Sequence, residues 1–107
     1  MNSLAYRIEI SPSALEDVRS CYDYIAETSE ETANKWFRGL QEAINSLDTM
    51  PLRCPRAPES DLLSMQIRHY IYQKNYRILY TVHDTVVKIH HIRHTARQWM
   101  GEEDFIL

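Results

Sequence analysis

The sequence predicts an α+β fold in which a helical hairpin packs on one face of a curved, mostly antiparallel sheet, in the order β-α-α-β-β-β. One segment of alternating polar and apolar residues comes first, two segments with helical periodicity follow, and three more alternating segments occupy residues 65–94. The connections within each group are short, which makes neighbouring elements antiparallel. At 107 residues, the chain is interpreted as one domain, residues 1–107, with a single hydrophobic core.

The first strand and the first helix are expected to follow one another directly. Residues 6–10 alternate apolar and charged side chains, as a half-buried strand does. Ser11 is then a suitable N-cap, and Pro12 suits the first helical position, where its missing N–H costs nothing. Glu16 and Asp17 are placed in the first turn, where acids favour the helix dipole. Apolar residues at helical spacing form one stripe: Ala14, Val18, Cys21, Tyr22 and Ile25.

The second helix is expected to begin a few residues after the first one ends. Thr28-Ser-Glu-Glu31 fits a capping box, whose first residue caps the helix. Apolar residues then recur at helical spacing up to Met50, and Pro51 ends the pattern. These apolar residues are Ala33, Trp36, Phe37, Leu40, Ile44 and Leu47. The short connection predicts an antiparallel helical hairpin.

The second half of the chain is expected to hold a loop and three strands. Residues 51–64 contain three prolines and no periodicity, which predicts an irregular loop at the surface. The strands are expected at residues 65–72, 76–83 and 86–94, with tight turns between them. In the last strand, Val87 and Ile89 fall on one face and Ile92 on the other, so we expect a β-bulge near His90 and His91.

Charge is distributed unevenly along the chain. Residues 50–100 contain eight lysines and arginines against three acids, whereas residues 1–49 contain four against nine. This asymmetry indicates a polyanionic or acidic partner for one face of the domain. There is no apolar run of the roughly 20 residues that span a bilayer, and the N-terminus lacks the features of a signal peptide, so we expect a cytoplasmic protein without a membrane partner. Cys21 and Cys54 are interpreted as reduced thiols.

Several segments in this order resemble the RelE/ParE superfamily of bacterial toxins from type II toxin–antitoxin modules. The resemblance covers residues 6–99, and the matching segments are Tyr6 to Val18, Ala33 to Pro51, Ile67-Arg68, Tyr76-Arg-Ile-Leu-Tyr80 and Ile92-Arg-His-Thr-Ala-Arg97. It implies a plasmid-stabilisation toxin that binds a cognate antitoxin protein in a heteromeric complex. It implies no cofactor and no metal.

The RelE-like branch of this superfamily cuts messenger RNA on the ribosome. Such cleavage needs cations that stabilise charge at the phosphate and groups that transfer protons. By position, the resemblance makes Arg77 the central phosphate-binding arginine and Arg97 the basic residue after the last strand, and it places Arg68 near a lysine of that branch. His94 is a further candidate, as a general acid or base. The tyrosine that this branch has a few residues after Arg97 is missing.

The ParE-like branch blocks DNA gyrase instead. Its last strand usually ends in I-x-x-I-x-H-x-x-R, which residues 89–97 fit, and the helix from Ala33 to Met50 also resembles this branch. We therefore expect a gyrase inhibitor that arrests growth when it is free of antitoxin, in which the candidate residues contact the target or the antitoxin. One alternative is a RelE-like endonuclease that acts on mRNA on the ribosome. Another is a family member that binds its antitoxin without being toxic.

Each candidate residue also has a purely structural interpretation. Arg77 alternates with core residues, so it can instead pair with a helical Glu or Asp beneath the sheet. Arg97, Arg93 and His94 lie at or past a strand end, where exposed polar residues are common. His90, His91 and His94 are not expected to bind metal, because adjacent strand residues point to opposite faces. The tail, residues 100–107, is interpreted as a frayed end, with docking on the sheet or on a partner as the alternative.

Overall fold

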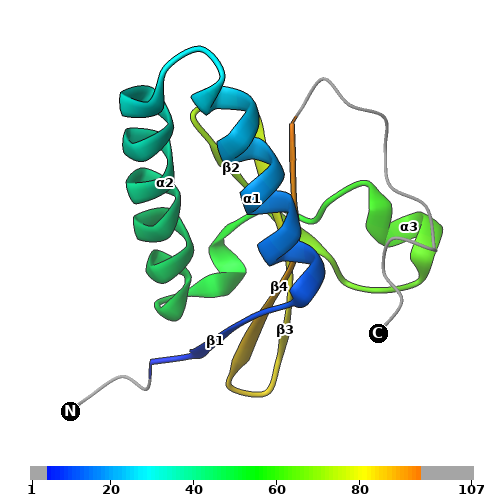
Figure 1. Ribbon diagram of the computed structural model, residues 1–107. Coiled ribbons are helices and arrows are strands. Elements are labelled where there is room, and N and C mark those ends of the chain that lie inside the picture. Colours follow the sequence, from blue (N-terminus) through cyan, green and yellow to red (C-terminus); the bar gives the residue numbers. More distant parts are fainter. Residues whose placement is uncertain (1–4, 95–107) are drawn as a thin grey trace.

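The computed structural model describes residues 5–94, which form a four-stranded sheet with helices on both faces (Figure 1). The strands are β1 (Arg7–Ile10), β2 (Arg68–Tyr72), β3 (Tyr76–His83) and β4 (Val86–His94), in the order β1-β4-β3-β2. β1 pairs with β4 in parallel, and the other pairs are antiparallel. The helices are α1 (Pro12–Ala26), α2 (Glu30–Asn45) and α3 (Glu59–Leu63). The predicted α+β fold is confirmed, with α3 as an addition to the predicted order.

The α1–α2 hairpin covers one face of the sheet and forms the main core with it. Ser11 caps α1 as predicted, because its Oγ accepts a hydrogen bond from the backbone N–H of Ala14 at 3.0 Å. The predicted cap of α2 is wrong by one residue: Ser29 accepts from Thr32 N, whereas Thr28 N still bonds the Ile25 carbonyl at the end of α1. Large buried side chains of this core come from α2, from the residues just after it and from the inner face of the sheet: Trp36, Leu40, Ile44, Leu47, Tyr72, Ile78, Tyr80, Ile89 and Ile92.

The connection that follows α2 is more ordered than the sequence predicts. α2 ends at Asn45 rather than at Met50, and two 3₁₀ turns follow it, η1 (Ser46–Asp48) and η2 (Pro51–Arg53). The expectation of an irregular surface loop over residues 51–64 is wrong, because it contains η2 and α3 and buries Pro51, Ala57, Glu59 and Ser60. A helix of five residues is too short to show apolar periodicity, which is why the sequence pattern did not reveal α3.

α3 lies against the other face of the sheet, where a second, smaller core forms. This core contains Ala57, Ile67 and Leu79. Ser60 Oγ donates to the Ile67 carbonyl at 2.7 Å and accepts from the Ile67 N–H at 2.9 Å. These bonds occupy the backbone of Ile67, so β2 begins at Arg68 rather than at residue 65, where the sequence placed its start.

The β3–β4 pair contains the predicted bulge. Leu79 pairs with His91 and Tyr80 pairs with Ile89, which leaves His90 as the extra residue on β4. The two turns of the sheet use left-handed backbone at Gln73, Lys74 and Asp84, without a glycine. Within residues 5–94, no helix combines the length and the apolar character that a membrane crossing requires.

Candidate functional site

Arg77 lies on the sheet face that α3 covers, and both terminal nitrogens of its guanidinium bind one carboxylate. Nη1 donates to Glu59 Oε2 at 2.8 Å and Nη2 donates to Glu59 Oε1 at 2.6 Å. Glu59 is fully buried, and the Arg77 side chain is 11% exposed. This is a bidentate, charge-assisted pair shielded from water, between a central strand and the first turn of α3.

His69 on β2 completes this cluster. Arg77 Nε donates to His69 Nδ1 at 3.2 Å, so Nδ1 is an acceptor and the neutral ring carries its proton on Nε2. Burial and the positive charge of Arg77 lower the pKa of His69, and the Glu59 carboxylate partly offsets this shift. His69 is therefore neutral at pH 7, and the cluster is one cation, one anion and one neutral imidazole.

Arg68 lies on the opposite face of the sheet from Arg77. It pairs with Tyr80 across the β2–β3 ladder, and Tyr80 belongs to the core beneath α1 and α2. The Arg68 guanidinium donates to the carbonyls of Leu52 and Cys54 at 3.3 and 2.7 Å. These bonds fasten η2 and the residue that follows it to the sheet. The structure therefore does not bring Arg68 and Arg77 together.

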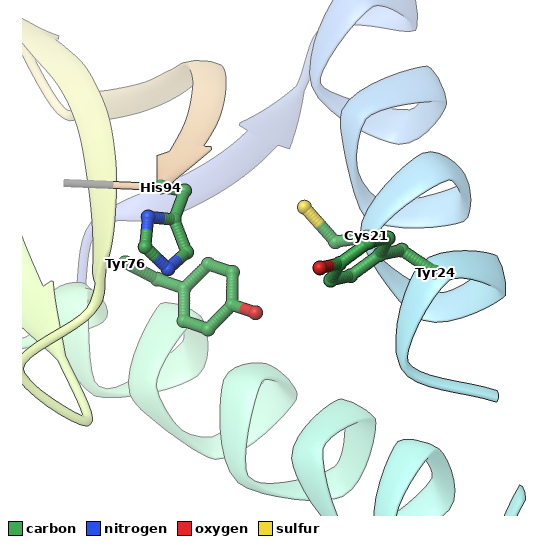
Figure 2. Close-up of a pocket in the computed structure, with 4 residues that line it drawn as sticks. All are labelled: Cys21, Tyr24, Tyr76 and His94. Atoms are coloured by element: carbon green, nitrogen blue, oxygen red, sulfur yellow. The ribbon is translucent and has the colours of Figure 1, made fainter. Parts of the chain in front are cut away.

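His94 ends β4 on the same side as the helical hairpin and faces a small cavity. Figure 2 shows Cys21 and Tyr24 of α1 on one side of this cavity, and Tyr76 and His94 of the sheet on the other. The cavity has a volume of about 240 Å³, and the Tyr76 and His94 rings meet edge to face at 5.2 Å. His94 is thus separated from Arg77 by the sheet. Arg97, the fourth candidate, lies outside the described residues, as does the tail.

The other two histidines of β4 have partners that the sequence did not indicate. His91 Nδ1 lies 2.8 Å from Asp17 Oδ2, which also accepts from the Ile92 N–H at 3.1 Å. The prediction that Glu16 and Asp17 lie in the first turn of α1 is wrong, because both lie in the second turn. Asp17 binds the edge of β4 beyond the last residue that pairs with β1. No sequence pattern indicates these contacts, because His91 and Ile92 follow Asp17 by 74 and 75 residues.

His90, the bulge residue, is buried against β3. Its Nε2 lies 2.9 Å from Thr81 Oγ1, and burial, Lys88 and His91 together lower its pKa to about 4. His90, His91 and His94 thus have three different surroundings. Among residues 5–94, no group of three or more potential metal ligands comes together.

Comparison with known proteins places this arrangement in a family. A family model described as the ParE toxin of the type II toxin–antitoxin system, parDE, matches residues 8–99. The chain belongs to this ParE toxin family. The prediction of a RelE/ParE superfamily toxin is therefore confirmed.

Two solved structures share the fold of this ParE-family chain. A chain of the chromosomal ParDE toxin–antitoxin system from P. aeruginosa superposes with a TM-score of 0.69 at 17% identity, over 86% of this chain and 98% of that one. A chain of the RelBE2 toxin–antitoxin complex from Mycobacterium tuberculosis gives a TM-score of 0.56 at 20% identity, over 90% of this chain and 98% of that one. At these identities the likeness concerns the fold. A search of curated protein sequences gives no match.

Proposed function

We propose that this ParE-family toxin acts in the cytoplasm by binding DNA gyrase and that it does not cleave RNA. The observation that carries the proposal is the buried Arg77–Glu59 pair. Both arms of the guanidinium hold a carboxylate, so a scissile phosphate has to displace a fully buried acid to reach it. A nuclease needs its cations and proton-transfer groups around one phosphate, whereas Arg68 and His94 lie across the sheet from Arg77.

The proposed partner of the toxin when it is inactive is a cognate antitoxin. Both similar solved structures are of toxin–antitoxin systems, which supports such a partner here. The α1–α2 hairpin offers a groove of about 470 Å³, lined by Leu15, Val18, Arg19, Tyr22, Asn34 and Phe37. Two of its apolar side chains are exposed together, Leu15 at 56% and Phe37 at 36%, so the groove presents an apolar surface to a partner. The antitoxin is proposed to place an amphipathic helix in this groove, or a strand along a free edge of the sheet.

The test is to induce the chain without an antitoxin and to follow two readouts together. Plasmid supercoiling with DNA-damage signalling reports on gyrase, and the integrity of translated mRNA reports on cleavage. We expect relaxed or broken DNA, intact mRNA and arrested growth. The double variant Glu59→Leu/Arg77→Met removes both charges of the buried pair and is expected to keep the effect on gyrase, provided that circular dichroism shows it to be folded.

Two results contradict the proposal. Cleavage of mRNA with normal DNA, lost in the folded double variant, makes Arg77 a catalytic residue of a ribosome-dependent nuclease. Tight binding of an antitoxin with no effect on growth at high expression identifies a non-toxic member of the family.

The variant Leu15→Glu tests the proposed antitoxin groove. It places a charge in the apolar groove and is expected to weaken the binding of a partner there.

A further inference from the structure

A second cavity lies between the N-terminal half of α2 and the turn from β2 to β3. Its volume is about 420 Å³, within the range of roughly 300–1,000 Å³ that is usual for small-molecule sites. Trp36 and Tyr76 supply aromatic walls, and Thr32, Lys35, Gln73 and Asn75 supply polar groups. Arg77 does not line this cavity, and neither do the residues of the groove on the helical hairpin.

Trp36 carries a hydrogen-bond donor without an acceptor. Trp36 is 3% exposed, and its indole Nε1 is buried without a hydrogen-bond partner among the described residues. The Trp36 backbone carbonyl accepts from the Tyr72 hydroxyl at 2.8 Å, and the centres of the Trp36 and Tyr76 rings lie 5.2 Å apart. A buried donor left unpaired is destabilising, so a donor of this kind on a residue that lines a cavity calls for an acceptor.

The other polar groups of the cavity offer donors to an anion, and the Thr32, Gln73 and Asn75 side chains also carry acceptors. Lys35 contributes an ammonium, and its pair with Glu31 is long and open to water, at 3.4 Å with side chains 68% and 80% exposed. Such a pair is worth only a few tenths of a kcal/mol, so an incoming anion competes with it easily. Gln73 and Asn75 add amide N–H groups, of which Gln73 uses one on the Tyr72 hydroxyl. Among residues 5–94, those that line the cavity include no acid.

We propose that this cavity binds a small aromatic carboxylate. The carboxylate pairs with the Lys35 ammonium and gives the Trp36 indole N–H its acceptor, while the planar group lies against Tyr76. Because Trp36 Nε1 is inaccessible to solvent, a hydrogen bond from it to the ligand requires the side chains around the indole to rearrange. The site is separate from the proposed action on gyrase, and its occupancy is measured on the purified chain.

The experiment is an NMR titration of the full-length, ¹⁵N-labelled protein with benzoate, following the indole N–H of Trp36. The sequence has two tryptophans, and the variant Trp99→Phe assigns the signal. Benzoate is expected to move the Trp36 N–H signal downfield in a saturable way, whereas benzamide, its uncharged analogue, has little effect. Lys35→Gln is expected to weaken binding about tenfold, as loss of one charge-assisted hydrogen bond does. The matched control Lys74→Gln, in the adjoining turn, is expected to leave the affinity unchanged.

Three results overturn the proposal. The first is a Trp36 N–H signal that benzoate does not move, which shows that the ligand does not supply the missing acceptor. The second is equal binding of benzamide, which removes the role of the charge. The third is a response to a capped Ala-Glu-Ala peptide but not to benzoate, which assigns the site to an acidic peptide instead of a small molecule.

Discussion

At the scale of single residues, the buried pair between Arg77 and Glu59 explains how β3 tolerates a buried cation. Arg77 stands directly opposite Arg93 of β4, and like charges opposed across a ladder destabilise it. The Glu59 carboxylate offsets the charge of Arg77, and His69 accepts from its remaining Nε–H. Each member of the cluster therefore depends on the others, as buried charges must be both paired and hydrogen-bonded.

Removal of the carboxylate alone is expected to be costly. Glu59→Leu leaves the Arg77 charge buried without its anion and should lower the free energy of unfolding by about 3–5 kcal/mol, measured by urea denaturation. Glu59→Leu/Arg77→Met removes both charges and should recover at least half of that loss. Asp61→Ala is the control, since its pair with Arg56 at 3.2 Å is exposed and should contribute less than about 1 kcal/mol. A double variant no more stable than the single one contradicts this account.

At the scale of elements, Gly39 sets how closely α2 approaches β2. A Cβ at this position collides with the Tyr72 hydroxyl, which donates to the Trp36 carbonyl one turn earlier in α2. The absence of a side chain thus lets a tyrosine of the sheet reach the backbone of the helix. Glycine lowers helix stability by about 1 kcal/mol relative to alanine. Here its small size allows the hydrogen bond from Tyr72 of β2 to the backbone of α2.

Gly39→Ala is therefore expected to destabilise the protein although alanine is the better helix former. The Tyr72 hydroxyl must move and lose its acceptor, and we expect a loss of about 1–3 kcal/mol in urea denaturation. Tyr72→Phe in the Gly39→Ala background removes the colliding oxygen and should restore part of the stability. If Gly39→Ala raises stability instead, Tyr72 has another rotamer available at low cost.

Strong local patterns made the fold predictable at this scale. Alternation over residues 76–83 and 86–94 gave the bounds of β3 and β4, and the change of apolar face between Ile89 and Ile92 indicated the bulge at His90. The structure of residues 51–64 could not be predicted from periodicity. Ser60 and Glu59 hold this segment in place through contacts with Ile67 and Arg77, which leave no repeating pattern in the sequence.

The candidate site was predictable only in part, for a related reason. The alternation of β3 made an ion pair of Arg77 with a helical acid one of two interpretations, but it could not name Glu59, which lies 18 residues earlier in a helix without periodicity. The separation of Arg68 and His94 from Arg77 depends on which face of the sheet each residue occupies. The pairing of Asp17 with His91 depends on where β1 ends, which only the three-dimensional arrangement shows.

At the scale of the whole molecule, two histidines, the buried His90 and the half-buried His69, make the stability depend on pH. The pKa of His90 is lowered to about 4 by burial, by Lys88 and by His91, and the pKa of His69 is lowered by burial and by Arg77. In the unfolded chain both groups take up a proton near pH 6.5. The unfolded state therefore binds more protons than the folded state below that pH, so acid favours unfolding.

Stability is expected to be full above about pH 6.5 and to fall as the pH drops towards 4. His90 alone should account for about 2 kcal/mol between pH 7 and pH 5, measured from urea midpoints at each pH. His90→Gln, which cannot take up this proton, should flatten the curve over that window. A variant with the same slope as the parent protein assigns the pH dependence to other groups.

The parallel pairing of β1 with β4 has a consequence for the order of assembly. Ser11, at the end of β1, donates to the His90 carbonyl across 79 positions of the chain, whereas the α1–α2 and β3–β4 hairpins join neighbouring segments. Closing so long a loop is entropically costly and slow, while hairpins form quickly and locally. We infer that the two hairpins assemble first and that β1 docks on β4 late. β1, the first of the four strands in the sequence, is thus among the last to pair.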